Sequence, residues 1–332
     1  MAEGGAEPRR DIIVLAIDGV PASLARRCWP AARIETLRSV FPTTSSSAWL
    51  TAMSGESVDD HGIPGVVFAL DNGTIVNLYH HQEPWAGAST RNVFDDAAEQ
   101  GYTPIAITAD LEVADCSWSR LLVRGARRRK GMRFFAGLAG RVVPAVLGDR
   151  LRLAVADALS DEAAAGPRLV WCFMELDRHV HEHGYDSTAI ECLEIFGRLA
   201  ASWATEGHIV VAHSDHGLVR TMHDPAVDSV LAEACRRYRS RMGGAGRTRW
   251  FHGIADQEVP EAIRWMTSEL GDLARACPAD DVFLPGRLAR RRVGSVVLTA
   301  LGERFATFDG HTHDHGSQLA DEVETPYGCW CA

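Results

Sequence analysis

The feature that most restricts the fold of this chain is an alternation of short apolar runs with longer segments of helical periodicity. Five runs rich in apolar and β-branched residues have the length of buried strands: residues 12–17, 104–108, 169–176, 208–213 and 293–301. Four segments between them have a helical pattern: residues 92–100, 151–159, 187–206 and 258–270. Strands that alternate with helices predict an α/β fold, with a mostly parallel central sheet flanked by helices on both faces.

The domain organisation is predicted to be simple. The chain has 332 residues, of which 46% are hydrophobic, and this is enough for a large buried core. We find no internal repeat and no clear linker, and predict one domain over residues 1–332. Two segments that break the alternation, residues 112–165 and 220–305, are candidate lids or inserts. Each contains an arginine-rich stretch, which either contacts an anionic substrate or forms a solvated surface.

Charge and targeting signals restrict the partners. The 44 acidic and 34 basic side chains give a net charge of −10, which argues against a nucleic-acid-binding surface. No run approaches the roughly 20 apolar residues that span a bilayer, and we see no secretory signal. We therefore predict a cytoplasmic protein that binds neither nucleic acid nor membranes. Its eight cysteines are expected to be reduced, with Cys329 and Cys331 in a tail.

Histidines are concentrated in a few places. Nine of the 14 lie in residues 179–183, 213–223 and 311–315, with aspartates in or beside each segment. Most of these polar clusters follow an apolar run, and ligands of α/β sheets bind beyond the carboxyl ends of the strands. One such cluster could be an ordinary surface feature, but three of them predict a metal site assembled from distant parts of the chain.

Individual motifs supply candidate ligands for that site. Asp18 ends the first apolar run in an Ile-Asp-Gly sequence, which could also be an ordinary turn. Asp177 and His181 are four residues apart and would share one face of a helix, where an oxygen and a nitrogen ligand suit zinc. Asp215 and His216 follow another apolar run, although a surface pair would have the same sequence.

Two further motifs allow both a structural and a functional interpretation. His315 lies in a histidine-rich segment that could be a surface loop. Residues 43–47 are five consecutive hydroxyl residues before a helix-like stretch, where they could cap the helix. At the same place, the positive field of the helix N-terminus favours an alkoxide and a bound phosphate, and a neighbouring metal ion would activate the hydroxyl further.

Taken in order, these motifs resemble the alkaline phosphatase superfamily, specifically its nucleotide pyrophosphatase/phosphodiesterase branch. The resemblance rests on Ile17-Asp18-Gly19, residues 42–55 followed by His61-Gly62-Ile63, Asp177-x-x-x-His181, Ser214-Asp215-His216-Gly217 and His315-Gly316. It implies an alkaline-phosphatase-like fold and two divalent metal ions, usually zinc. By position, Asp177, His181 and His315 would hold one metal. Asp18, Asp215 and His216 would hold the other, together with the nucleophile.

The resemblance also implies the nucleophile. In the family it lies ten residues before the glycine that closes the segment, so counting back from Gly55 gives Ser45, with Thr44 as the alternative. The family commonly has an asparagine three residues after the nucleophile that donates to the phosphate, and Ala48 occupies that position here. The Asp-Ser dipeptide plus arginine arrangement of true alkaline phosphatases is also missing at this nucleophile segment. The phosphate donor is therefore expected among backbone amides near Ser45 or in an arginine-rich segment.

The expected function is a zinc-dependent phosphoester hydrolase, similar to phosphodiesterases and nucleotide pyrophosphatases. Its substrate would be a small nucleotide-like phosphoester, cleaved through a phosphorylated serine or threonine. One alternative is a phosphomonoesterase acting on a nucleotide or phosphorylated metabolite. Others are a phosphomutase or phosphonate hydrolase, and an inactive zinc-binding module on the same scaffold. Bound cations would offset the acidic charge of the chain toward an anionic substrate.

Overall fold

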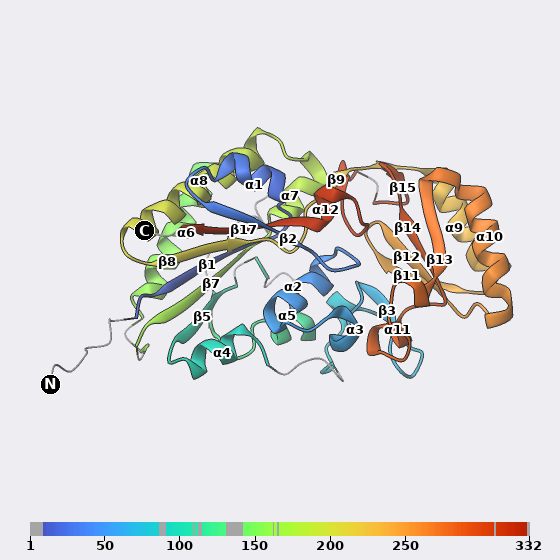
Figure 1. The fold of residues 1–332 in the computed structure, drawn as a ribbon, viewed down its shortest axis with the longest axis horizontal. Coiled ribbons are helices and arrows are strands. Elements are labelled where there is room, and N and C mark those ends of the chain that lie inside the picture. Colours follow the sequence, from blue (N-terminus) through green and yellow to red (C-terminus); the bar gives the residue numbers. More distant parts are fainter. Residues whose placement is uncertain are drawn as a thin grey trace.

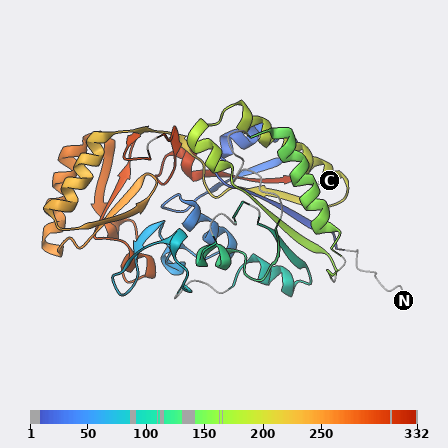
Figure 2. The ribbon, with the colours of Figure 1, turned by 180° about the vertical axis from the view of Figure 1, so that it is seen from behind.

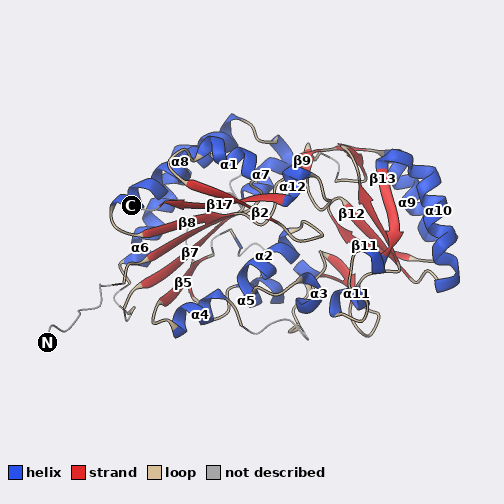
Figure 3. Cartoon of the chain, viewed as in Figure 1, coloured by secondary structure: helices blue, strands red, loops and turns tan. Residues whose placement is uncertain are grey.

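The computed structural model places two β-sheets next to each other, with helices packed around both (Figures 1 and 3). It describes residues 9–85, 91–108, 110–111, 115–130, 142–161, 163–164, 166–308 and 310–330. Seen from behind, the two sheets again lie side by side (Figure 2). The helices α9 (Pro225–Arg237) and α10 (Val259–Leu270) lie on the outer side of the second sheet. None of the described helices is long and apolar enough to cross a membrane.

The larger sheet has seven strands in the order β2-β17-β8-β1-β7-β5-β6. Their bounds are β1 Ile12–Ile17, β2 Arg33–Arg38, β5 Thr103–Ile107, β6 Arg127–Arg129, β7 Arg168–Met174, β8 Ile209–His213 and β17 Glu324–Trp330. Strands β8, β1, β7, β5 and β6 run parallel, whereas β17 is antiparallel to both of its neighbours. The prediction of a mostly parallel central sheet is confirmed.

Helices cover both faces of this sheet, as the alternation predicted. One face packs against α1 (Ala22–Cys28), α6 (Pro144–Leu159) and α8 (Ser187–Thr205), and the other against α2 (Ser45–Ser54), α4 (Val93–Glu99) and α5 (Ser117–Leu122). Successive residues of β1 point to opposite faces, so Leu15 and Ile17 join the first core cluster and Ala16 joins the second. The sheet is therefore buried on both sides, which explains its continuous apolar runs.

The second sheet was not predicted. It has six antiparallel strands in the order β13-β14-β12-β11-β3-β4. Their bounds are β3 Val67–Ala69, β4 Ile75–Asn77, β11 Arg241–Ala245, β12 Thr248–His252, β13 Ala274–Pro278 and β14 Val296–Ala300. Helices α9 (Pro225–Arg237) and α10 (Val259–Leu270) pack on it around a third core cluster. Much of it comes from residues 220–305, and the single domain stays a prediction.

One predicted apolar run belongs to this second sheet. Residues 293–301 contain β14 (Val296–Ala300). Its Val296 and Leu298 face the third core cluster, whereas Val297 joins the second core cluster, which also contains residues of α2, α4 and α5. Because β14 is covered on both faces, its sequence has the continuous apolar pattern of a central parallel strand. The sequence thus identified the strand but not the sheet to which it belongs.

Short elements complete the chain. The helices are α3 (Val58–His61), α7 (Leu176–His183), α11 (Leu288–Arg292) and α12 (Ala320–Val323). The single 3-10 turns are η1 (Leu78–His80), η3 (Asp256–Glu258), η4 (Gly271–Leu273) and η5 (Ala279–Asp281). Two small strand pairs join β9 (Val219–Arg220) to β16 (His313–Asp314) and β10 (Met222–His223) to β15 (Arg304–Phe305).

Two peripheral segments bear on the predictions: the expected C-terminal tail and the first arginine-rich stretch. The expected tail is an internal strand up to Trp330, which packs against Trp29 at a ring-centroid distance of 5.7 Å. Cys329 lies in this strand, and Cys331 lies outside the described residues. The first arginine-rich stretch, residues 124–130, contains the edge strand β6, and its Arg129 pairs with Asp161 at 2.9 Å, which favours the solvated-surface interpretation.

Candidate active site

The predicted ligands converge at the carboxyl ends of three neighbouring strands. Asp18 follows β1, Asp177 lies in the first turn of α7 just after β7, and the Asp215–His216 pair follows β8. Because these strands are adjacent in the order β8-β1-β7, their following residues meet at one edge of the sheet. The backbone N–H of Asp177 donates to the carbonyl of Asp18 at 3.1 Å, which fixes the two loops together.

One cluster is formed by Asp18, Asp215 and His216, all buried. Their potential ligand atoms lie within 4.8 Å of one another. The Nε2 atom of His216 is 3.5 Å from Oδ1 of Asp18 and 3.2 Å from Oδ2 of Asp215. The structure therefore brings together the residues expected to hold one metal.

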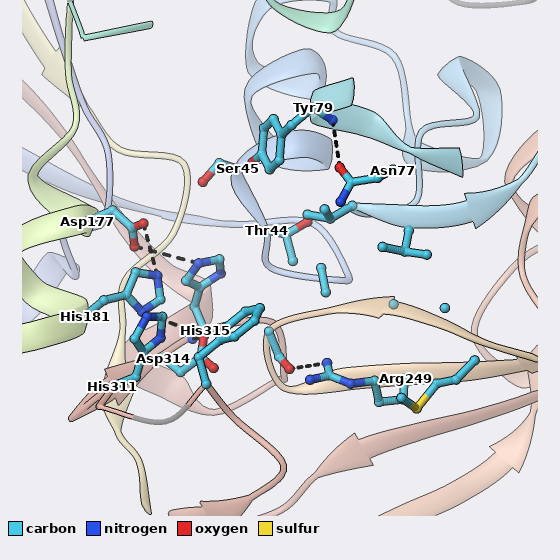
Figure 4. Close-up of a pocket in the computed structure, with 18 residues that line it drawn as sticks. Thr44, Ser45, Asn77, Tyr79, Asp177, His181, Arg249, His311, Asp314 and His315 are labelled. Atoms are coloured by element: carbon cyan, nitrogen blue, oxygen red, sulfur yellow. Dashed lines mark hydrogen bonds and ion pairs between the residues drawn. The ribbon is translucent and has the colours of Figure 1, made fainter. Parts of the chain in front are cut away.

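The other predicted ligands form a neighbouring cluster (Figure 4). His181 Nε2 lies 3.1 Å from Oδ2 of Asp177, and His315 Nε2 lies 3.7 Å from Oδ1 of the same carboxylate. The two clusters are contiguous, because Asp177, His216 and His315 also place potential ligand atoms within 4.8 Å. The imidazole rings of His216 and His315 stack with their centroids 3.8 Å apart.

Hydrogen bonding around the site fits metal ions. The Nδ1 atoms of His181, His216 and His315 each face a backbone carbonyl: His313 at 2.8 Å, Gly217 at 3.3 Å and Thr43 at 2.7 Å. An imidazole that donates from Nδ1 keeps its Nε2 lone pair for a metal. The buried Oδ1 of Asp177 and Oδ2 of Asp215 have no hydrogen-bond partner, as expected for oxygens that bind a cation.

The carboxylates are costly to bury together without such cations. Burial, with a smaller contribution from Asp177, raises the pKa of Asp18 to about 8. Burial and the charge of Asp18 also raise the pKa of Asp215. For Asp177 the effect of burial is outweighed by the imidazoles of His181 and His315, which lower its pKa. Two divalent cations would stabilise the ionised forms of all three carboxylates.

Ser45, rather than Thr44, presents its hydroxyl to the clusters. Ser45 is the first residue of α2, and its Oγ lies 3.1 Å from Nε2 of His216 and donates to Oδ1 of Asp18 at 3.3 Å. Thr44 is the residue before the helix, and its buried Oγ1 pairs with the Ser46 hydroxyl at 2.9 Å. The geometry therefore favours Ser45 of the two candidate nucleophiles.

A cavity of about 460 Å³ opens in front of Ser45. Asp177, His181 and His315 line one side, and Figure 4 shows Asn77, Tyr79 and Arg249 on other parts of its wall. Ala48 is buried within α2 and offers no donor there. The Oδ1 of Asn77 accepts from the N–H of Tyr79 at 3.0 Å, and this hydrogen bond orients its side-chain amide.

Several residues at the site were missed by the sequence analysis. Trp49 donates from Nε1 to Oδ2 of Asp18 at 3.0 Å. Asp314 lines the cavity with a buried carboxylate that lies near His181 and His315. Arg249 comes from the second arginine-rich stretch. Asp314 is adjacent to the candidate ligand His315, Trp49 lies within the segment of residues 42–55, and Arg249 lies in the arginine-rich residues 235–250. These motifs marked the regions, but they did not assign a role to any of the three residues.

The remaining clustered histidines have varied roles. His179 pairs with Asp186 at 3.0 Å, and His213 packs its ring on Trp49. The carbonyl of His313 accepts from His181. His311 stacks on His181 with ring centroids 4.3 Å apart and lines the cavity. His183 is exposed and lies beside Glu182 at 3.7 Å. His311 and His313 therefore contact the candidate ligand His181 directly.

Replacing Trp49 with phenylalanine tests how the Asp18 carboxylate is held. If Asp18 holds zinc, as the resemblance implies, loss of the indole N–H should weaken zinc binding by about 10- to 100-fold, the effect of removing a partner that orients a metal ligand. Competition with a chromophoric chelator measures this affinity. The matched control is Trp29→Phe, which removes a buried indole hydrogen bond to the Leu193 carbonyl away from the site. Equal zinc affinities in the two variants would contradict the assignment.

Comparison with known proteins decides the family. The sequence matches the model of the family described as type I phosphodiesterase / nucleotide pyrophosphatase over residues 13–321. The chain belongs to this family. Membership places it in the alkaline phosphatase superfamily and identifies it as a phosphoester hydrolase. No curated protein matches the chain in sequence.

Two solved structures share the fold of this chain. Phosphonoacetate hydrolase from Sinorhizobium meliloti 1021, in complex with phosphonoformate, is 18% identical with a TM-score of 0.71, covering 98% of this chain and 90% of its own. An inactive variant of murine ectonucleotide pyrophosphatase / phosphodiesterase 5, in complex with AMP, is 14% identical with a TM-score of 0.68, covering 97% and 88%. The predicted alkaline-phosphatase-like fold is thereby confirmed.

Proposed function

We propose that this family member is a two-metal hydrolase that cleaves small phosphoesters through Ser45. Asp18, Asp215 and His216 would hold one ion together with Ser45, and Asp177, His181 and His315 the other. The observation that carries the proposal is the position of the Ser45 hydroxyl. It lies at a helix N-terminus, within 3.3 Å of both Asp18 and His216. Histidine nitrogen and carboxylate oxygen together favour zinc at both positions.

Two bound zinc ions would supply positive charge to the attacking and leaving oxygens of the reaction. Ser45 Oγ forms a bond to phosphorus as the bond from phosphorus to the leaving oxygen breaks, and the hydroxyl proton passes to solvent. The N-terminus of α2 stabilises the phosphate bound beside it. A water molecule then cleaves the phosphoserine, releases phosphate or its monoester, and restores the serine hydroxyl.

The cavity supports a small, nucleotide-like phosphoester as the substrate. Its volume of about 460 Å³ lies in the range of small-molecule sites, and it leaves room for a sizeable group on the phosphate. We therefore propose phosphodiesters or pyrophosphates over simple monoesters. Six of the described cysteines, at positions 28, 116, 172, 192, 235 and 277, are free thiols, which supports a cytoplasmic location.

Metal content and two model substrates test this proposal. We expect the zinc-loaded protein to bind two metal ions per chain by elemental analysis, as implied by the two clusters. It should hydrolyse bis(p-nitrophenyl) phosphate with a kcat/KM about 10-fold or more above that for p-nitrophenyl phosphate, a difference of about 1.4 kcal/mol in transition-state binding. The reverse preference would indicate a phosphomonoesterase. Two bound metals without hydrolysis of either ester would indicate a non-catalytic module.

A further inference from the structure

Two arginines at the same hairpin differ in how their charge is neutralised. Arg247 lies in the turn between β11 and β12, is fully buried, and forms an ion pair with Glu322 at 2.9 Å. Arg249 lies two residues later, in β12. No carboxylate of the described residues lies within ion-pair distance of its guanidinium, and Asp314 and Asp228 act on it only from farther away. Arg249 is therefore the arginine whose charge lacks a direct partner.

Backbone carbonyls hold this guanidinium in place. Nη1 donates to the carbonyls of Gly246 and Thr248, and Nη2 donates to that of Ala306 at 2.8 Å. The guanidinium also lies over the ring of Phe305, with Cζ 5.8 Å from its centroid. Nε makes no hydrogen bond to any described residue. Arg249 is thus fixed in orientation and keeps a free donor.

Its position relative to the reacting centre is informative. Arg249 lines the same cavity as Ser45, and Figure 4 shows it across that cavity from Asp177 and His181. Burial lowers the pKa of Arg249, in keeping with a cation that is removed from water without a carboxylate beside it. Arg249 is partly buried, and a cation withdrawn from water without a counter-ion is costly, so an anion that enters the cavity would reduce that cost.

We propose that Arg249 binds a second oxyanion of the substrate, a carboxylate or a phosphate, remote from the reacting phosphorus. The proposal rests on the proposed function, because the first anionic group must occupy the metal clusters. It narrows the substrate class to phosphoesters that carry a negative charge at both ends. The guanidinium suits this task, because its planar set of donors matches oxyanions.

Direct binding of non-hydrolysable phosphonates tests the proposal without requiring turnover. The probes are alkylphosphonates of two to four carbons, the ω-carboxyalkylphosphonates of the same lengths, and the matching alkane bisphosphonates. Calorimetry on the zinc-loaded protein gives the Kd of each, and elemental analysis afterwards checks that no probe has removed the metal. We expect the best doubly anionic probe to bind about 10-fold or more tighter than its alkyl counterpart.

Substitutions of Arg249 test whether the preference for doubly anionic probes depends on its guanidinium. Arg249→Gln should remove most of this preference and change the Kd of the plain alkylphosphonates by less than about 2-fold, while Arg249→Lys should retain part of it. Arg241→Gln is the control, because Arg241 is exposed on β11 and does not line the cavity, although its loss changes the net charge equally. Thermal unfolding checks that each variant folds, and Arg249→Lys serves if the glutamine variant does not.

The possible outcomes separate the two proposals. Preference for carboxylates or for bisphosphonates identifies which oxyanion Arg249 accepts. Equal binding of singly and doubly anionic probes by the wild type, no binding of any probe, or an unchanged preference in Arg249→Gln would overturn the role of Arg249. Failure of the zinc-loaded protein to hydrolyse the model esters contradicts the proposed function instead, and leaves the binding ratios measurable.

Discussion

Replacing Ser45 with alanine is expected to lower kcat for bis(p-nitrophenyl) phosphate by about a thousandfold or more, as for other covalent nucleophiles. The variant loses the hydroxyl oxygen that is proposed to form the phosphoenzyme, whereas the clusters that would bind metal keep their carboxylates and imidazoles. Its zinc content and melting temperature should therefore stay close to those of the wild type. A loss of zinc equal to the loss of activity would make Ser45 a metal ligand without a nucleophilic role.

The neighbouring hydroxyl provides the matched control. Thr44→Val removes a hydroxyl that pairs with Ser46 rather than with the clusters, and should leave kcat within about 10-fold of the wild type. Ser45→Thr restores a hydroxyl at the first position of α2 and should recover part of the activity. Intact-mass analysis after acid quenching should detect a phosphorylated chain in the wild type and none in Ser45→Ala. If Ser45→Ala is active and Thr44→Val is not, Thr44 is the nucleophile.

The central strands β1, β5, β7 and β8 could be predicted because they are largely buried and have apolar sequences. The edge strands β2 and β6 are rich in charged residues and largely exposed, and they were not predicted. The second sheet could not be predicted either, since strand β11 has the sequence Arg-Met-Gly-Gly-Ala, with two glycines where strands usually have large side chains. The strand depends on its neighbours β12 and β3 rather than on its own residues. Likewise, β17 contains Pro326 and Gly328, which are unfavourable in most strands.

The predicted ligands of the site came from a simple rule and a resemblance. Asp18, Asp215 and His216 lie within three residues of the ends of apolar strands, so their place at the sheet edge was predictable from local sequence. The groups that hold the ligands in place could not be predicted in this way. Trp49 reaches Asp18 across 31 residues, and the Thr43 carbonyl meets His315 across 272. Such contacts depend on the tertiary fold, and a single sequence carries no local pattern for them.

The ion pair between Arg247 and Glu322 connects the second sheet to the candidate metal site. Both side chains are fully buried, and Nε of Arg247 lies 2.9 Å from Oε1 of Glu322. The backbone N–H of Arg247 donates to the carbonyl of His315 at 2.8 Å. Gly246 allows this approach, because a Cβ there would lie 2.0 Å from the same carbonyl oxygen. The position of His315 therefore depends on this hairpin.

Replacing Glu322 with alanine should lower the free energy of unfolding by about 3–5 kcal/mol, because it leaves a fully buried guanidinium without its partner. It also removes the acceptor for the N–H of Ser317 at 3.3 Å and that of Leu319 at 3.1 Å. Urea unfolding of metal-free protein measures the change, since bound zinc would add its own stabilisation. The control is Glu233→Ala, which breaks an exposed pair with Arg236 and should cost less than about 1 kcal/mol.

A double replacement tests whether the protein needs the two charges of the Arg247–Glu322 pair or only side chains that fill the same space. Arg247→Met with Glu322→Leu removes both ions, and should regain much of the stability lost in Glu322→Ala, because neither apolar side chain has to be desolvated. Zinc affinity is the second readout. If the pair serves mainly to hold His315, the double variant should bind zinc more weakly than the wild type even where its stability recovers. Wild-type zinc affinity in a recovered double variant would show that packing alone positions His315.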